Sequence, residues 1–419
     1  MNQSGTIVYI LGSFPTLSET FILREVVGLR RKGLPVTVVA LNRGHQEGLS
    51  PEERVCMRDA RFVPSLFFPT VLWATLVAFL TSPRRYAKAF RRMMGQPHQS
   101  LYCYLRALYH VLAVGAIVRR LSNGPPVVHV HGHFASLSTE VAMGVAAFLD
   151  VPFSFTAHAK DIDMSANTLP EKMRAAQFVV TCTDYNARYL QTVCPDLHPE
   201  HVVVVRQGVP LDEIEWTPSR PSSPPLILSV GRLVEKKGHH HLIDACAMLR
   251  GADIPFRCLI IGDGPLRQSL STMIVKKGLW DRITLEGSRP YRQLMECYRR
   301  ATVFVLPSLI TESGDREGVP NVLVEAMAFG VPVVATPTSG IPELVMDGET
   351  GLLVPPGDAR GLAVAMARLI RNDDLRRRLS TAGRWKVEAE YDIEHNIVPL
   401  MALFETCLPL WPLSAFQSV

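Results

Sequence analysis

Short apolar runs alternate with longer amphipathic segments along almost the whole chain. Apolar runs bounded by Gly or Pro are typical of buried parallel strands, and the segments between them have helical periodicity. In the first half, the predicted strands are residues 7–11, 36–41, 127–130, 153–157, 179–183 and 202–205. In the second half, they are residues 226–230, 257–261, 283–286, 303–306 and 331–335. This alternation predicts an α/β protein with two doubly wound, mostly parallel sheets.

One segment rich in proline and serine separates the two series of strands. It reads EWTPSRPSSPP over residues 215–225, which is the composition of a linker. We therefore predict a first domain at residues 1–214 and a second at residues 226–390. Residues 391–419 are expected to include a helix that crosses back to the first domain, and the tail at 408–419 has no assignment.

A glycine turn follows the first strand and leads into a helix. Residues 12–15 read GSFP and predict a tight loop. The helix is predicted from Ser18, a capping residue, to Lys32, and Gly33 ends it. Glu19 stands at the helix start, where capping is its favoured role.

The segment at residues 303–343 combines a buried strand, a polar loop and a helix with clear ends. Pro320 suits the first helical position, and Gly330 before Val331 and Pro332 predicts a left-handed stop. The first amides of this helix lack intrahelical acceptors and carry the positive end of the dipole, so the junction favours a phosphate. Gly318 lets a ligand approach the backbone closely.

Two glutamates flank this junction. Glu317 precedes the helix, and Glu325 lies one turn after Asn321 on the same face. Carboxylates are poor partners for phosphate, so we interpret both as acceptors for sugar hydroxyls on either side of a diphosphate. The alternative is a solvated Glu317 and a salt-bridged Glu325.

Two cationic residues follow a second glycine turn. The predicted strand at 226–230 is followed by GRLVEKKG, in which Arg232 follows the turn and Lys237 stands at the start of the next helix. A guanidinium and an ammonium so placed could clamp a diphosphate leaving group and stabilise the charge that develops on it. For either cation alone, surface solvation is the alternative.

Histidines stand near the carboxyl ends of two strands in the first domain, where such sheets bind ligands. His158 follows one strand, and His129, His131 and His133 alternate along another. No carboxylate or thiolate accompanies these three, so we predict no metal, and His129 is assigned to the core. A helix cap is the plainer role for Asp161.

Two further motifs resemble binding sites less closely. Three adjacent histidines at residues 239–241 would point in different directions on a helix and would not converge on one metal. Gly262 and Gly264 follow a strand, but the third glycine of a dinucleotide loop is missing. We interpret this segment as a tight turn that lines a cleft.

The stretch between Asp59 and Glu140 contains no acidic residue. Its basic residues are Arg61, Arg84, Arg85, Lys88, Arg91, Arg92, Arg106, Arg119 and Arg120. Residues 62–80 are strongly apolar but carry two prolines near their start, which makes them a poor membrane span. Residues 82–94 place cations on one side of a helix and apolar residues on the other, as membrane-interface helices do. An ordinary surface helix that packs on the sheet is the alternative, and the whole segment 62–95 favours an anionic membrane.

Composition places the chain among globular proteins. It has 419 residues, of which 47% are apolar and 20% charged, and its formal net charge is +5. The eight cysteines are scattered without metal or redox spacing, and the start of the chain lacks a basic leader. We therefore expect a cytoplasmic protein associated with the inner face of the cell membrane, without a nucleic-acid partner.

The motifs together resemble the family 4 (group 1) retaining glycosyltransferases over nearly the whole chain. Glu317 and Glu325 match the family's pair of glutamates separated by seven residues, and Arg232 and Lys237 match its Arg and Lys. The exopolysaccharide and colanic-acid type is the most similar, through GSFPTLSETFILRE, FTAHAKDI and SGDREGVPNVL.

The resemblance implies two Rossmann-like domains facing across a cleft, the GT-B architecture. It implies transfer of a hexose, with retention, from a nucleoside-diphosphate sugar, for which we expect UDP, to a lipid-linked saccharide. No cofactor and no obligatory metal are implied. His158, Glu317, Arg232 and Lys237 would be catalytic, with His158 on the transferred sugar. Donor binding is assigned to Gly12, Gly262, Gly318, Pro320, Asn321, Val322 and Glu325. A hydrolysing sugar-nucleotide epimerase and a non-catalytic binding protein are the alternatives.

Overall fold

The computed structural model describes residues 5–16, 19–44, 49–63, 68–163, 168–216 and 222–407. It divides into two compact units, and each is described by itself. Unit 1 comprises residues 1–182, 187–205 and 397–419, and unit 2 comprises residues 183–186 and 206–396. The boundary between the units therefore lies between Val205 and Arg206, ahead of the predicted linker. Part of that linker lies outside the described residues. Ser18 and the tail at 408–419 also lie outside them.

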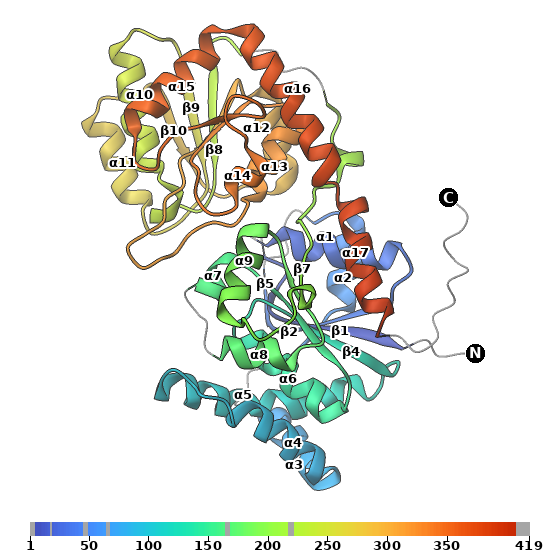
Figure 1. Cartoon of the computed structure of the whole chain (residues 1–419). Coiled ribbons are helices and arrows are strands. Elements are labelled where there is room, and N and C mark those ends of the chain that lie inside the picture. Colours follow the sequence, from blue (N-terminus) through green and yellow to red (C-terminus); the bar gives the residue numbers. More distant parts are fainter. Residues whose placement is uncertain are drawn as a thin grey trace, which may run out of the picture. The chain divides into compact units, whose positions relative to one another are not determined.

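Unit 1 contains a seven-stranded parallel sheet in the order β3-β2-β1-β4-β5-β6-β7 (Figure 1). The strands are β1 (Thr6–Phe14), β2 (Val36–Arg43), β3 (Arg61–Phe62), β4 (Val127–His133), β5 (Phe153–Ala157), β6 (Val179–Thr181) and β7 (Val202–Val204). Both faces of the sheet are covered. On β1, Ile7 and Tyr9 enter one hydrophobic core, and Val8 and Ile10 enter the other, because successive side chains of a strand point to opposite faces.

The helices of unit 1 pack on both faces of this sheet. They are α1 (Thr20–Arg31), α2 (Pro51–Asp59), α3 (Pro69–Thr81), α4 (Pro83–Met94), α5 (Leu101–Leu121), α6 (Leu137–Leu149), α7 (Ala159–Asp163), α8 (Leu169–Ala175) and α9 (Asp184–Val193). The last helix of the chain, α17 (Ile393–Glu405), adds Ile397, Leu400 and Phe404 to the core that contains Tyr9.

The first strand is longer than predicted. The loop expected to begin at Gly12 is wrong, because β1 continues to Phe14 and pairs Ser13 and Phe14 with Asn42 and Arg43 of β2. Helix α1 begins at Thr20. Glu19 precedes it but makes no side-chain capping hydrogen bond, so the predicted cap is also wrong.

Unit 2 contains a six-stranded parallel sheet in the order β10-β9-β8-β11-β12-β13. The strands are β8 (Leu226–Val230), β9 (Arg257–Ile261), β10 (Ile283–Glu286), β11 (Val303–Leu306), β12 (Val333–Ala335) and β13 (Leu352–Leu353). The helices are α10 (His239–Gly251), α11 (Arg267–Lys276), α12 (Tyr291–Arg300), α13 (Asn321–Ala328), α14 (Ile341–Leu344), α15 (Ala359–Arg371) and α16 (Asp373–Glu390). Four of the five strands predicted here have the predicted bounds, and β12 starts at Val333.

The acid-free stretch forms the helices α3, α4 and α5. Helices α3 and α5 pack closely at Gly115, where a Cβ would lie 2.7 Å from the Thr75 Cα atom. Helix α4 buries Ala89, Met93 and Met94 in the core of unit 1. The apolar side of α4 is therefore used for packing, and the alternative of an ordinary surface helix describes it better than a free membrane-interface helix.

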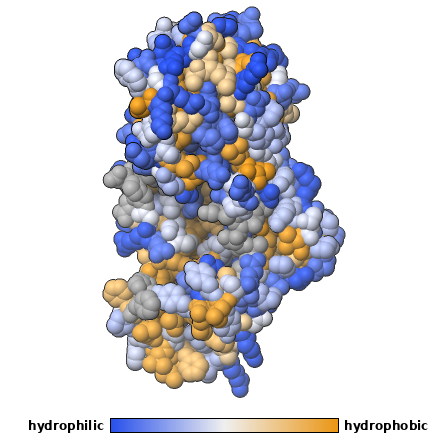
Figure 2. Space-filling view, turned by 90° about the vertical axis from the view of Figure 1, so that its left-hand side faces the viewer, coloured by the Kyte–Doolittle hydropathy of each residue, from blue (hydrophilic) through white to orange (hydrophobic). Residues whose placement is uncertain are grey.

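Phe90 of α4 is exposed, but most exposed apolar side chains of this stretch lie on α3 and on the first half of α5. This apolar surface consists of Phe68, Leu72, Trp73, Leu76, Phe79, Leu80, Leu101, Tyr102, Tyr104, Leu105 and Leu108. Figure 2 shows apolar side chains gathered at the end of unit 1 that these helices form. Within the described residues, α5 alone is long and apolar enough to span a bilayer, but its second half is packed in the core.

Candidate functional site

Two glycine loops touch at the carboxyl ends of β8 and β9. Gly262 has φ +148°, and a Cβ there would lie 2.0 Å from the Gly231 carbonyl oxygen. The Gly231 amide in turn donates to the Ile261 carbonyl at 2.9 Å. No side chain fits between the loops, so this contact explains Gly262 without a ligand. Its assignment to donor binding stays a prediction.

The loop after β8 is also held against the end of β11. Gly238 has φ +63°, and a Cβ there would lie 1.9 Å from the Pro307 carbonyl oxygen. The Leu309 amide donates to the Lys236 carbonyl at 2.7 Å. These contacts bring two consecutive lysines to the polar loop that precedes α13.

Glu317 lies between both ammonium groups. The Lys237 Nζ atom is 3.2 Å from Glu317 Oε2, and the Lys236 Nζ atom is 3.4 Å from Glu317 Oε1. The side chains of Lys237 and Glu317 are only 11% and 12% exposed. Lys236 also contacts Asp315 at 3.0 Å. Sequence analysis singled out Lys237 and Glu317 but missed Lys236, although the paired lysines after the glycine turn were a signal.

The charge state of Glu317 follows from the two lysines that contact it. Burial alone would raise the pKa of Glu317, but Lys237 and Lys236 outweigh burial and hold that pKa below its usual value. Asp315 also pairs with Lys236, so the two lysines of the site face two carboxylates. An incoming anion would take over lysine contacts from these carboxylates.

Arg232 is exposed on the same loop. Its neighbour Leu233 is fully buried and anchors the loop. Among the described residues, ion pairs join Glu317 to both lysines and not to Arg232. Arg232 therefore lies on the loop that carries Lys237, without a described ion pair to Glu317.

Helix α13 starts one residue later than predicted, because Pro320 has an extended ψ of 124° and precedes the first helical residue, Asn321. The Leu323 amide donates to the Pro320 carbonyl at 2.9 Å, so the amides of Asn321 and Val322 precede the helical hydrogen bonds. The predicted left-handed stop at Gly330, with φ +72°, is confirmed.

Glu325 lies inside α13 and is 4% exposed. Its Oε2 atom accepts a hydrogen bond from the Tyr298 hydroxyl at 3.0 Å. A ligand hydroxyl would have to share this carboxylate with Tyr298. Gly318, between Glu317 and Pro320, is partly exposed at the loop that leads into the helix.

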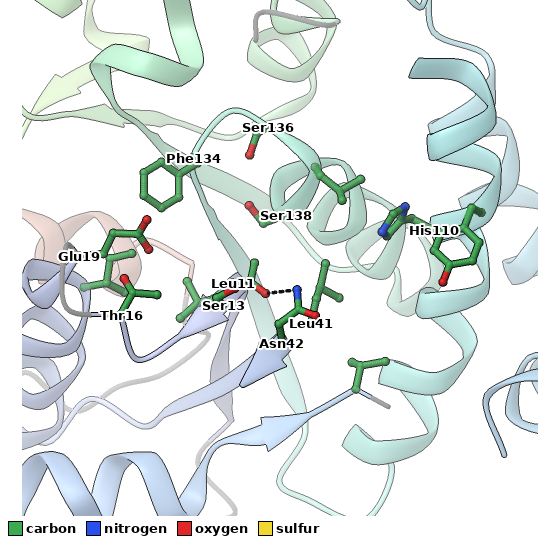
Figure 3. A pocket seen from close by; sticks show the side chains of 15 residues that line it. Leu11, Ser13, Thr16, Glu19, Leu41, Asn42, His110, Phe134, Ser136 and Ser138 are labelled. Carbon is green, nitrogen blue, oxygen red and sulfur yellow. Dashed lines mark hydrogen bonds between the residues drawn. The ribbon is translucent and has the colours of Figure 1, made fainter. Parts of the chain in front are cut away.

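Unit 1 contains a cavity of about 460 Å³ at the carboxyl ends of β1, β2 and β4 (Figure 3). Gly12 lines it, with open space where a Cβ would be. The Asn42 side-chain amide donates to the Gly12 carbonyl at 3.2 Å. Glu19 reaches the cavity from the start of α1, and His110 from α5. Hydroxyl groups and apolar side chains complete the lining, so the cavity suits a ligand with both polar groups and apolar faces.

His158 lies at the end of β5 beside this cavity. Its ring centroid is 4.6 Å from that of Phe134, which lines the cavity, and 5.0 Å from that of Phe21. Phe134 has φ +65°, a strained conformation for a bulky residue, and strain of this kind gathers at functional sites. The His158 amide donates to Asp161 at 3.0 Å, which fits the predicted capping role.

Burial shifts the pKa values of this cluster. It lowers the pKa of His158 well below its ordinary value and raises the pKa of Asp161 to about 7. His129 is fully buried, as predicted, and burial lowers its pKa to about 3. His129 and His158 are therefore neutral inside the fold.

One group among the described side chains has the composition of a metal site. The ligand atoms of Glu25, His131 and His133 lie within 4.8 Å of one another. Sequence analysis missed this carboxylate because it comes from α1. Both ring nitrogens of His131 already have partners, the hydroxyls of Ser154 at 2.8 Å and Thr156 at 2.9 Å. A metal would have to displace one of them.

Comparison with known proteins adds two family matches. Residues 18–213 match the model of Glycosyltransferase Family 4, and residues 212–386 match that of Glycosyl transferases group 1. WcaL of Salmonella typhimurium, named as a colanic acid biosynthesis glycosyltransferase, is 30% identical and covers 95% of this chain and 99% of its own. The amylovoran biosynthesis glycosyltransferase AmsK of Erwinia amylovora is 39% identical over 48% of each chain.

Solved structures agree on the fold. The Anabaena protein HepE, solved with UDP and glucose, has a TM-score of 0.70 at 16% identity, over 96% of this chain and 100% of its own. The sucrose-phosphate synthase of Thermosynechococcus elongatus has a TM-score of 0.67 at 18% identity, over 96% of this chain and 98% of its own. The two parallel sheets and these likenesses establish the GT-B fold, with two Rossmann-like domains.

Proposed function

Because this chain belongs to the family 4, group 1 glycosyltransferases, we propose that it transfers a hexose from a UDP-sugar to a lipid-linked saccharide during exopolysaccharide biosynthesis. Retention at the anomeric carbon is part of the proposal. The observation that carries it is the nearly buried contact between Lys237 and Glu317, which lies at the glycine loops of unit 2.

This contact suits the junction between the sugar and the diphosphate of a donor. An ammonium is a partner for phosphate oxygens, and a carboxylate accepts hydrogen bonds from sugar hydroxyls. When the bond between sugar and diphosphate breaks, negative charge develops on the diphosphate. Lys237 would stabilise that charge, with Arg232 from the same loop and the amides of Asn321 and Val322.

The other predicted residues complete the donor site. Glu317 would bind hydroxyls of the transferred sugar, and Glu325 would hold the ribose together with Tyr298. His158 of unit 1 is the residue that we expect to contact the transferred sugar. Two cationic side chains would supply the positive charge at the diphosphate, so we expect no metal requirement.

The nucleotide and the pathway rest on relatives. HepE was solved with UDP and glucose, which supports UDP as the nucleotide. WcaL and AmsK are named for colanic acid and amylovoran biosynthesis, which supports an exopolysaccharide product. The family resemblance implies a lipid-linked saccharide as the acceptor.

The cavity of unit 1 is the proposed acceptor site. Its lining mixes polar and apolar side chains, with Asn42, Glu19 and several hydroxyls available to a saccharide (Figure 3). Helix α5 contributes His110 to this cavity, and the same helix carries Leu101, Tyr102 and Leu105 on the apolar surface. An amphiphilic acceptor could therefore reach the cavity along α5.

The apolar surface is the proposed contact with an anionic bilayer at the inner face of the cell membrane. Trp73 is 59% exposed and Leu101 is 74% exposed, which is costly in water and favourable at a lipid interface. Arg91 and Arg92 are exposed on the neighbouring helix α4, and no acidic residue lies within the stretch. Both features attract anionic headgroups.

The decisive experiment couples donor breakdown to product formation. The purified protein is incubated with a panel of sugar nucleotides and a lipid-linked saccharide, and nucleoside diphosphate release and product mass are measured together. We expect UDP release in equal amount to a glycosylated acceptor whose new linkage keeps the donor's anomeric configuration. UDP release without any glycosylated acceptor would instead indicate an epimerase or hydrolase, and no release would indicate a binding protein.

A further inference from the structure

We propose that Glu25 acts through His133 to fix the tautomer and orientation of His158, and that Glu25 is therefore a positioning residue for the transfer reaction. This inference rests on the proposed function, in which His158 contacts the transferred sugar. The three side chains come from α1, β4 and the end of β5, so only the folded unit brings them together.

A continuous series of hydrogen bonds connects the three side chains. The Glu25 Oε1 atom lies 2.8 Å from the Tyr9 hydroxyl and 3.0 Å from His133 Nε2. The other nitrogen of His133, Nδ1, lies 3.4 Å from His158 Nε2. His133 is fully buried and Glu25 is 15% exposed, so water competes little for these bonds.

The direction of each bond follows from the carboxylate. An ionised carboxylate only accepts, so both of its neighbours must donate. Burial, reinforced by Glu25, raises the pKa of Tyr9 well above its ordinary value, and its hydroxyl keeps the proton that it donates. His133 must likewise carry its proton on Nε2.

The tautomer of His158 is the consequence. When His133 carries a single proton, on Nε2, its Nδ1 atom offers a lone pair, and His158 must then donate to it from Nε2. The His158 Nδ1 atom is then the nitrogen with a lone pair. The tautomer of His158 therefore decides which of its nitrogens can donate to a sugar hydroxyl and which can accept from one.

The ring of His158 is also held in orientation. It stacks on His133, with the centroids 5.7 Å apart and an interplanar angle of 20°. Phe134 and Phe21 pack against it at 4.6 Å and 5.0 Å. Hydrogen bonds therefore set which nitrogen carries the proton, and the aromatic contacts set where the ring points.

The first test is the tautomer itself. The protein is labelled with ¹⁵N-histidine, the spectra are recorded near pH 8, where ordinary histidines are neutral, and His158 is assigned with a His158→Gln variant. We expect the Nε2–H tautomer for His158 in the wild-type protein. The Nδ1–H tautomer in the wild type would overturn the inference, and this measurement needs no variant of Glu25 and no substrate.

The second test removes the carboxylate. In Glu25→Gln the amide can either donate or accept, so it no longer dictates the proton on His133. We expect a mixed His158 tautomer and a kcat that falls about 10- to 100-fold, as when partners behind an active-site histidine are lost, with KM for the donor nearly unchanged. An unchanged His158 signal together with wild-type kcat would refute the positioning role.

A matched control separates positioning from general destabilisation. Glu140 is another buried carboxylate of unit 1 and pairs with Lys172 at 3.2 Å. Glu140→Gln should lower the melting temperature but keep the wild-type His158 tautomer. If the wild type shows the expected tautomer but no transferase activity with any donor, the proposed function fails while the hydrogen-bond relay stands.

Discussion

At the scale of single residues, two consecutive lysines have different tasks. Lys236 is held by Asp315 at 3.0 Å and by the Arg316 carbonyl at 3.1 Å, whereas Lys237 pairs with Glu317 alone among the described carboxylates. Lys237 can therefore turn to a diphosphate with the loss of one partner. Lys236 would have to give up several.

This difference predicts unequal effects of substitution. Lys237→Ala should lower kcat about 10²- to 10³-fold, the effect of removing a group that stabilises transition-state charge. Lys236→Ala is the matched control, with the same charge change on the same loop, and should lower kcat far less. Steady-state kinetics with a saturating donor measures both. Equal losses in the two variants would contradict the assignment of Lys237 to the leaving group.

Residue patterns could single out candidate residues of the site but not the contacts that surround them. Arg232, Lys237 and Glu317 stand in short motifs with recognisable chemistry. The contact of Glu25 with His133 joins positions 108 residues apart, and that of Tyr298 with Glu325 joins positions 27 apart. Such contacts depend on how helices pack, and spacing along the chain does not determine them.

At the scale of elements, the helices α3 to α5 show where amphipathic patterns mislead. The cations of α4 face solvent as predicted, but Ala89, Met93 and Met94 pack in the core. The first half of α5 is instead exposed, with Tyr102 at 72%. Periodicity identifies an apolar side of a helix, but the neighbouring helices decide whether that side is covered.

The apolar surface predicts binding to anionic vesicles. Flotation should recover the protein with the vesicles at low salt, and binding should weaken as salt rises, because charge attraction is screened over about 10 Å at 0.1 M salt. Trp73→Ala should weaken binding about tenfold or more, since a large apolar side chain no longer enters the interface. Trp280, which is 74% exposed in unit 2, provides the control variant Trp280→Ala.

Two outcomes of that experiment would contradict the membrane proposal. One is a protein that stays in the soluble fraction with anionic vesicles at low salt. The other is equal weakening by Trp73→Ala and Trp280→Ala, which would indicate non-specific adsorption instead of docking through α3 and α5.

At the scale of the whole molecule, the alternation of strands and helices was sufficient to predict two doubly wound sheets. The central strands are apolar runs, so all eleven predicted strands overlap observed ones, and five of them have identical bounds. The edge strands β3 and β13 have two residues each and were not predicted. Their pairing depends on the neighbouring strand, because so short a segment carries no periodicity.

Buried histidines predict that both units lose stability in acid. Burial lowers the pKa of His129 in unit 1 to about 3 and that of His239 in unit 2 to about 4. Each therefore takes up a proton below pH 6.5 only on unfolding, and each should cost about 2 kcal/mol of stability at pH 5. His131 and His158 act in the same direction.

Asp161 acts in the opposite direction. Its pKa is raised to about 7, so it stabilises the fold at low pH and that contribution is lost as pH rises through 7. Denaturant unfolding between pH 8 and pH 5 should show falling stability on acidification, and Asp161→Asn should make the fall in unit 1 steeper. Constant or rising stability down to pH 5 would show that these histidines are not neutral in the fold.

The central claim is that the loop at residues 231–238 and the start of α13 hold one diphosphate. Hydrogen exchange of the full chain with and without UDP measures this directly, because amides at a ligand site become protected. We expect protection by UDP, and less by GDP, in peptides that cover residues 231–238 and in those that cover residues 318–323. Protection of only one of these segments, or of neither, would contradict the account.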